Sequence, residues 1–194
     1  RSGVYVSSGD PTNPATTYSP VSLGAFGAAL ALIQGSRISL AAAPSDASVV
    51  YALADGPLVW RIDNVTATPV VQIPADLFTA QADYDQTIAV HPTRPERIAL
   101  GGCFTVVPAG SSNFNAAIFV ASVTRPGGVG NYRFGFAPAT AGDSSSADAY
   151  VGVGVHADVH MLRFVPVGGA VQLWTGCDGG VFRSLRGGDH RRRW

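Results

Sequence analysis

The sequence carries little charge. Charged residues make up 13% of its 194 residues, and 13 basic side chains balance 13 acidic ones, so the formal net charge is zero. A neutral chain has no bulk electrostatic attraction for nucleic acid or for an anionic membrane surface. We therefore expect neither nucleic acid nor a membrane as a partner.

Long apolar runs and the short motifs of common metal and nucleophile sites are also missing. The longest mainly apolar run, 23–33, is interrupted by Gly24 and Gly27. It is shorter than the roughly 18 to 20 apolar residues that span a bilayer. There is no CxxC pair, HExxH zinc motif or GxSxG nucleophile elbow. These absences predict a protein without a cofactor, with a divalent cation as the one exception considered below.

Cysteine is scarce, which limits cross-linking. Cys103 follows Pro92 by eleven residues, and Cys177 follows Pro166 by the same number. This equal spacing predicts corresponding places in neighbouring structural units, farther apart than the roughly 7 Å between Cα atoms that a disulfide tolerates. We predict two free, largely buried thiols.

Glycine and proline are abundant, with 23 and 13 residues, and hydrophobic residues make up 46% of the chain. This composition is typical of many short strands joined by tight turns. The stretch Val155–Ser184 shows the pattern most clearly, because its apolar runs alternate with turn residues. It predicts an antiparallel meander with strands at Val159–Val165, Val171–Thr175 and Val181–Arg183, and with turns at Pro166–Gly169 and Asp178–Gly180.

Imperfect copies of this stretch recur along the chain at intervals of about 60 residues, a spacing typical of the blades of a β-propeller. The aromatic residues that mark the last strand of each copy are Tyr5, Trp60, Phe119 and Phe182. We therefore predict an all-β fold, a single partial β-propeller over 1–194. Its expected blades are approximately 1–22 (partial), 23–75, 76–140 and 150–194 (incomplete).

Three to four blades cannot close a ring, so we expect a fragment of a propeller of about six to eight blades, with exposed blade edges that could self-associate. Outer strands are expected within 64–74 and at Tyr132–Phe136. The proline-rich segment Asp10–Pro20 is expected to be a loop, and 141–147 a flexible excursion. Ser22–Gln34 is compatible with a short helix or an outer strand, and the surrounding pattern favours the strand.

Four segments resemble the bacterial neuraminidase-repeat, or Asp-box, propellers. They are Tyr84–Pro92 (YDQTIAVHP), Gly101–Gly102, Val155–His160 (VHADVH) and Asp178–Ser184 (DGGVFRS). The resemblance covers roughly residues 37–184 and implies a sialidase-like or sortilin-like β-propeller that is secreted, to the extracellular space or the periplasm. It also implies a glycosyl hydrolase-like scaffold whose ligand is a glycan or a protein.

His156, Asp158 and His160 are the first candidate binding residues. In an extended segment, residues two apart share a face, and this segment leads into a predicted first strand, which in a propeller lines the central channel. Two imidazoles and a carboxylate on one face could bind a divalent metal or a sugar hydroxyl. They could equally tie neighbouring blades together.

Asp83, Tyr84 and Asp85 lie at nearly the same place one blade earlier, so Asp83 and Tyr84 are further candidate ligand-binding residues. Asp85 and Asp158 together would supply the two carboxylates of a glycosidase. The sequence predicts a secreted β-propeller scaffold that binds glycan or protein ligands without catalysis. The alternative is a glycoside hydrolase, xyloglucanase-like or sialidase-like, that uses Asp85 and Asp158. Asp178 is expected to cap its own turn.

Overall fold

The computed structural model of the chain is all-β, as the composition predicts. It describes residues 4–10, 12–21, 37–54, 58–73, 81, 83–105, 115–135, 149–185 and 194. Within these residues, no helix has the length and hydropathy that a bilayer crossing requires.

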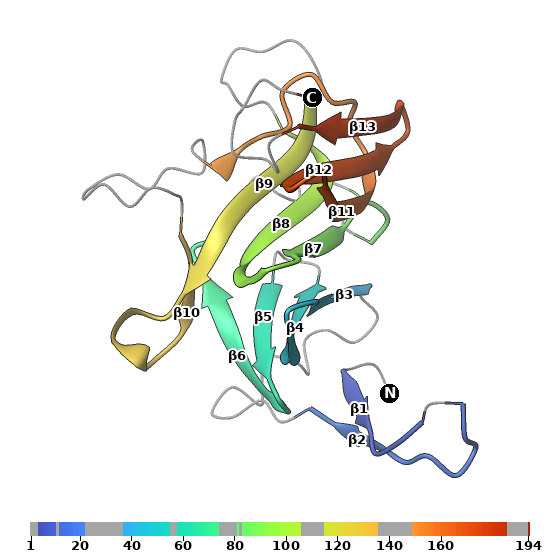
Figure 1. The fold of residues 1–194 in the computed structure, drawn as a ribbon, viewed down its shortest axis with the longest axis vertical. Coiled ribbons are helices and arrows are strands. Elements are labelled where there is room, and N and C mark those ends of the chain that lie inside the picture. Colours follow the sequence, from blue (N-terminus) through green and yellow to red (C-terminus); the bar gives the residue numbers. More distant parts are fainter. Residues whose placement is uncertain are drawn as a thin grey trace.

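A short hairpin and three antiparallel meanders follow one another along the chain (Figure 1). The hairpin consists of β1 (Tyr5–Ser7) and β2 (Tyr18–Pro20). The first meander consists of β3 (Ile38–Ala43), β4 (Asp46–Ala54), β5 (Leu58–Asp63) and β6 (Thr66–Val71). The second meander consists of β7 (Thr87–His91), β8 (Arg94–Thr105), β9 (Asn115–Thr124) and β10 (Tyr132–Gly135). The third meander consists of β11 (Val159–Val167), β12 (Ala170–Cys177) and β13 (Gly180–Ser184).

The three strands expected within Val155–Ser184 are present, each longer than expected, and Pro166 and Val167, which were expected in a turn, belong to β11. β6 and β10 fall at the sequence positions where further strands were expected. A second expectation was also wrong in part. The end of the proline-rich segment, Tyr18–Pro20, forms β2 and pairs with Tyr5–Ser7 instead of remaining a loop. Its preceding part does turn, since Asp10 accepts a hydrogen bond from the backbone of Thr12 at 2.8 Å. The segments Ser22–Gln34 and 141–147 lie outside the described residues.

The first and second meanders belong to one eight-stranded sheet, with the order β3-β4-β5-β6-β10-β9-β8-β7. The link is a parallel pairing of β6 with β10, in which Val70 faces Tyr132 and Val71 faces Arg133. The end strands β3 and β7 also lie against each other, so this sheet is nearly closed and barrel-like. The segments expected as separate blades at 23–75 and 76–140 are thus hydrogen-bonded to each other through β6 and β10.

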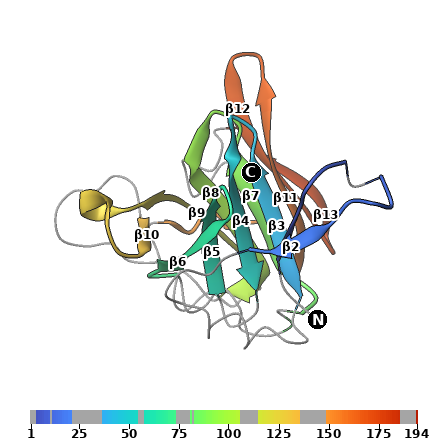
Figure 2. The same ribbon diagram turned by 90° about the horizontal axis from the view of Figure 1, so that it is seen from below.

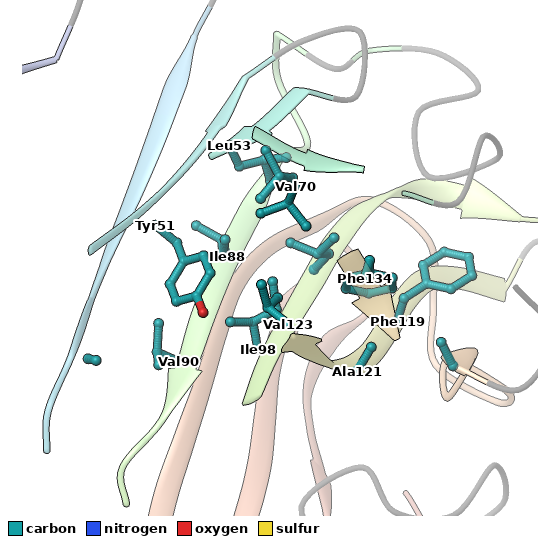
Figure 3. Packing of buried hydrophobic residues seen from close by; sticks show 14 of the residues in the cluster. Tyr51, Leu53, Val70, Ile88, Val90, Ile98, Phe119, Ala121, Val123 and Phe134 are labelled. Atoms are coloured by element: carbon teal, nitrogen blue, oxygen red, sulfur yellow. The ribbon is translucent and has the colours of Figure 1, made fainter. Parts of the chain in front are cut away.

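Both faces of the second meander are buried. The cluster that it shares with the first meander includes Leu100. It also includes Tyr51, Leu53, Ile98 and Phe119, which are labelled in Figure 3. The cluster that it shares with the third meander includes Ala99, Ile118, Val120, Val159 and Leu173. Strands covered on both faces carry continuous apolar runs rather than an alternating pattern, and the run AAIFVA within β9 has this form.

The aromatic residues spaced at about 60 positions occupy corresponding places in the meanders. Trp60, Phe119 and Phe182 lie on the third strand of their meanders, opposite Ala52, Leu100 and Thr175 on the second strand. Each of the three packs toward the part of the chain that precedes its meander. Tyr5, on β1, is 41% exposed.

We predict that Gly101→Ala destabilises the protein, because β8 and β11 approach too closely for a side chain. A Cβ on Gly101 would lie 2.7 Å from Cγ1 of Val159 and 2.8 Å from Cγ2 of Thr87. Overpacking of this kind lowers the free energy of unfolding by about 1 to 3 kcal/mol. Urea denaturation measures the change.

The matched control is Gly9→Ala, where the nearest atom to the new Cβ is 3.9 Å away. Its free energy of unfolding should stay within about 0.5 kcal/mol of the wild-type value. A Gly101→Ala protein as stable as the wild type would contradict the close packing of β8 on β11.

Candidate functional site

A cluster of polar side chains lies where the first strands of the second and third meanders begin. Asp85 comes two residues before β7, Asp158 comes directly before β11, and Cys103 lies on β8. The backbone holds these segments in place. The N–H of Asp85 donates to the carbonyl of Gln81 at 2.8 Å, and the N–H of Asp158 donates to the carbonyl of Cys103 at 2.9 Å.

Two β-bulges position side chains in this cluster and beside it. The register of β8 against β9 shifts between Gly102 and Phe104, so Cys103 is the extra residue there. The register of β11 against β12 shifts between Val159 and Met161, so His160 is the extra residue in that strand. A bulge bends its strand and re-aims one side chain, which is why bulges are frequent beside functional sites.

Asp85, Cys103 and Asp158 bring their ligand atoms together. One carboxylate oxygen of each aspartate and the sulfur of Cys103 all lie within 4.8 Å of one another. The Cys103 thiol donates a hydrogen bond to Oδ1 of Asp158 at 3.2 Å. Asp85 is 0% exposed, and neither of its carboxylate oxygens has a hydrogen-bond partner among the described residues. These oxygen and sulfur atoms are suitable ligands for a divalent metal.

Burial controls the protonation of Asp85 and Cys103. Burial, together with the negative charge of Asp158, raises the pKa of Asp85 from 3.8 to about 6, against an opposing effect of His160. Burial and the hydrogen bond to Asp158 raise the pKa of Cys103 to about 11. At neutral pH the thiol is therefore protonated and can donate to Asp158.

His160 connects the buried cluster to the surface. Its Nδ1 lies 3.4 Å from Oδ1 of Asp85, and its Nε2 lies 2.6 Å from Oδ1 of Asp178. The ring of Tyr84 meets the imidazole edge-on, with the ring centroids 4.9 Å apart. Exposure rises outward along this chain of contacts, from a fully buried Asp85 side chain to 32% for His160 and 50% for Asp178. Tyr84 is 56% exposed.

The expectation that His156, Asp158 and His160 share one face rested on an extended backbone, and this premise was wrong. Asp158 has a left-handed φ of 64°, which reverses the alternation of side chains at that residue. His156 is exposed, and its Nδ1 lies 3.0 Å from the carbonyl of Ala157. His156 also packs closely on Gly179: a Cβ added to Gly179 would lie 2.4 Å from the Cβ of His156.

The other predicted residues fall into two groups. Asp85 and Asp158 come together, as their shared position in neighbouring units suggested, whereas Asp83 is exposed and lies outside the three-residue cluster. The carboxylate of Asp178, which was expected to cap its turn, contacts Nε2 of His160.

Cys103 and Cys177 are free and buried, as predicted, but the proximity of Cys103 to the aspartates was missed. The equal spacing from Pro92 and Pro166 located the thiols along the units and carried no signal for this contact.

An open groove of about 410 Å³ lies between the first strands of the three meanders. These strands are β3, β7 and β11, and β7 lies against both of the others. All three run through the same part of the molecule in Figure 2. The lining includes Ala41, Ile88, Val90, Leu162, Arg163 and Phe164. The groove is mainly apolar, and the aspartates of the cluster are not part of this lining.

A scan against protein-family models finds no matching family, and searches of curated proteins and of solved structures find no match. The resemblance to the neuraminidase-repeat propellers therefore stays a prediction.

We predict that Asp85 makes stability fall as pH rises from about 4 to about 6. Its folded-state pKa of about 6 lies above the ordinary value of 3.8, so the unfolded chain loses the proton first. The stabilising contribution is complete below about pH 4 and is lost as pH rises through about 6. Urea denaturation of the wild type and of Asp85→Asn across this range, with EDTA present, measures it.

Asp83→Asn is the matched control, because it removes an exposed carboxylate two residues away. Its pH profile should follow that of the wild type, whereas Asp85→Asn should remove the decline. Parallel profiles for the wild type and Asp85→Asn would show that Asp85 titrates normally.

Proposed function

We propose that the three meanders are successive blades of a β-propeller and that the protein is a non-catalytic scaffold for a glycan or protein ligand. Two observations support the propeller. The meanders pack face to face in chain order, with an apolar cluster at each junction. Their first strands lie side by side along one groove, as the inner strands of a propeller do around its channel.

A surface patch of Tyr84, His160, Asp178 and His156, the binding patch, is the observation that carries the binding function. It combines a half-exposed aromatic ring with an imidazole and a half-exposed carboxylate. A sugar presents an apolar face that can stack on a ring and hydroxyl groups that donate to a carboxylate. The imidazole is already fixed by the contact to Asp178 at 2.6 Å, so a ligand meets it in a defined orientation.

The alternative function is a glycoside hydrolase with Asp85 and Asp158 as the catalytic pair. The raised pKa of Asp85, about 6, favours it, since the general acid of a glycosidase needs such a shift. Burial opposes it, because Asp85 is 0% exposed and a glycosidic oxygen cannot reach it in this conformation. We therefore prefer the binding scaffold.

The remaining parts of the proposal come from the resemblance and from the sheet edges. We propose a secreted protein, extracellular or periplasmic, because the similar propellers are secreted. In the described part of the chain, β13 lies at an edge of the three-stranded sheet. Unpaired backbone groups of such an edge can pair with a second copy, so self-association through this strand belongs to the proposal.

We predict that Tyr84→Ala and Asp178→Asn each weaken glycan binding by about tenfold or more, because each removes a contact group from the binding patch. A carbohydrate array identifies the ligand, and titration calorimetry measures its dissociation constant. Tyr18→Ala is the matched control, since Tyr18 on β2 is 55% exposed, close to the 56% of Tyr84. Glycan binding that is equally strong in both patch variants, or no binding to any carbohydrate, would refute this patch as a glycan site.

We also predict no turnover. Incubation of the wild-type protein with the same carbohydrates should release no reducing ends, since the buried carboxylate of Asp85 cannot act on a bound sugar. Hydrolysis that disappears in both Asp85→Asn and Asp158→Asn would decide for the hydrolase.

A further inference from the structure

The close approach of Asp85, Cys103 and Asp158 is electrostatically unfavourable when these groups are ionised. The three residues come from three separate segments, and their ligand atoms lie within 4.8 Å of one another. Two carboxylates and a thiol at this distance repel one another when ionised, and burial strengthens the repulsion. Such a group is stable when it is protonated or when a cation binds to it.

Asp85 gives the second, independent observation. Its side chain is fully buried, yet both of its carboxylate oxygens lack a hydrogen-bond partner among the described residues. Buried carboxylates are normally paired, hydrogen-bonded or bound to a metal. The nearest basic group is Nδ1 of His160 at 3.4 Å from Oδ1, longer than a good hydrogen bond, and Oδ2 is left without any partner that the described residues supply.

We propose that Asp85, Cys103 and Asp158 bind one divalent metal ion of the zinc class. The sulfur ligand decides the class, because Ca²⁺ and Mg²⁺ require oxygen ligands whereas Zn²⁺ accepts both thiolate and carboxylate. On binding, the S–H bond of Cys103 breaks, a metal–sulfur bond forms and the proton passes to the solvent. The proposal does not depend on the binding function proposed above.

The surroundings of the cluster suit a metal site. The side-chain amide of Gln81 donates to the sulfur of Cys103 at 3.5 Å and can stabilise a thiolate. His160, held by Asp178 at 2.6 Å, lies beside Asp85 and can orient its carboxylate. Partners of this kind around the ligands tune a bound metal and fix the geometry of its ligands. They place Gln81 and His160 as positioning residues.

A metal at this point would join the second and third meanders. Asp85 and Cys103 belong to the second meander and its leading segment, and Asp158 leads into the third. The two meanders are separate sheets. Their junction is formed by side-chain packing, by the backbone contact between Asp158 and Cys103, and by backbone hydrogen bonds between β9 and the segment that precedes β11. Because binding requires the folded arrangement of all three ligands, the metal should raise the stability of the folded protein.

The test uses the full chain, stripped of metal with a chelator and titrated with Zn²⁺ in a calorimeter. We expect one equivalent to bind to the wild type and to raise its melting temperature. Cys103→Ser and Asp158→Asn should weaken binding by more than the roughly 10- to 100-fold that loss of a positioning residue costs. The matched controls Cys177→Ser and Asp83→Asn remove the other buried thiol and the neighbouring exposed carboxylate, and should bind as the wild type does.

Co²⁺ provides a readout that does not require the ligand variants to fold. Cys177→Ser has Cys103 as its single thiol, so a cobalt–thiolate charge-transfer band in this protein identifies the sulfur ligand. Absence of stoichiometric Zn²⁺ binding to the wild type would overturn the proposal. Binding that persists at full strength in folded Cys103→Ser and Asp158→Asn, or a thiolate band that disappears in folded Cys177→Ser, would overturn it as well.

Discussion

The burial of the second meander between its two neighbours is the constraint on which the rest of the structure depends. Along β8, Ile98 and Leu100 pack toward the first meander, whereas Ala99 packs toward the third. Because successive strand residues point to opposite faces, a shift of one residue would exchange these two sets. Large side chains would then point into the narrow junction with β11, where the atoms around Gly101 leave no room even for a Cβ.

The polar cluster exists because of this packing. Asp85 and Asp158 each precede the first strand of a meander, and the packing of those strands brings their carboxylates next to Cys103. The bulges at Cys103 and His160 interrupt the strand alternation where the two meanders meet. The same packing that stabilises the fold therefore also withdraws Asp85 and Cys103 from water and raises their pKa values.

The strands within each meander could be predicted from sequence because turns rich in glycine or proline separate them, although β11 continues through Pro166 and the turn lies at Gly168 and Gly169. The position of Asp85 near Asp158 could also be predicted, because the two residues lie at nearly the same place before the first strands of their meanders. Contacts between meanders could not, because the parallel pairing of Val70 with Tyr132 joins residues far apart in sequence. The contact of Cys103 with Asp158 depends on a bulge, and the left-handed backbone of Asp158 redirects His156. Neither feature has a hydrophobic pattern that would reveal it.

The parallel pairing of β6 with β10 also makes the walls of the groove unequal. The first and second meanders are held to each other along two lines, by this pairing of their last strands and by the contact of their first strands, β3 and β7. The third meander forms its own sheet, so the ladder of backbone hydrogen bonds that joins β3 to β7 through the other six strands does not include β11. A ligand in the groove would therefore contact two walls that belong to one hydrogen-bonded sheet and a third wall that belongs to another.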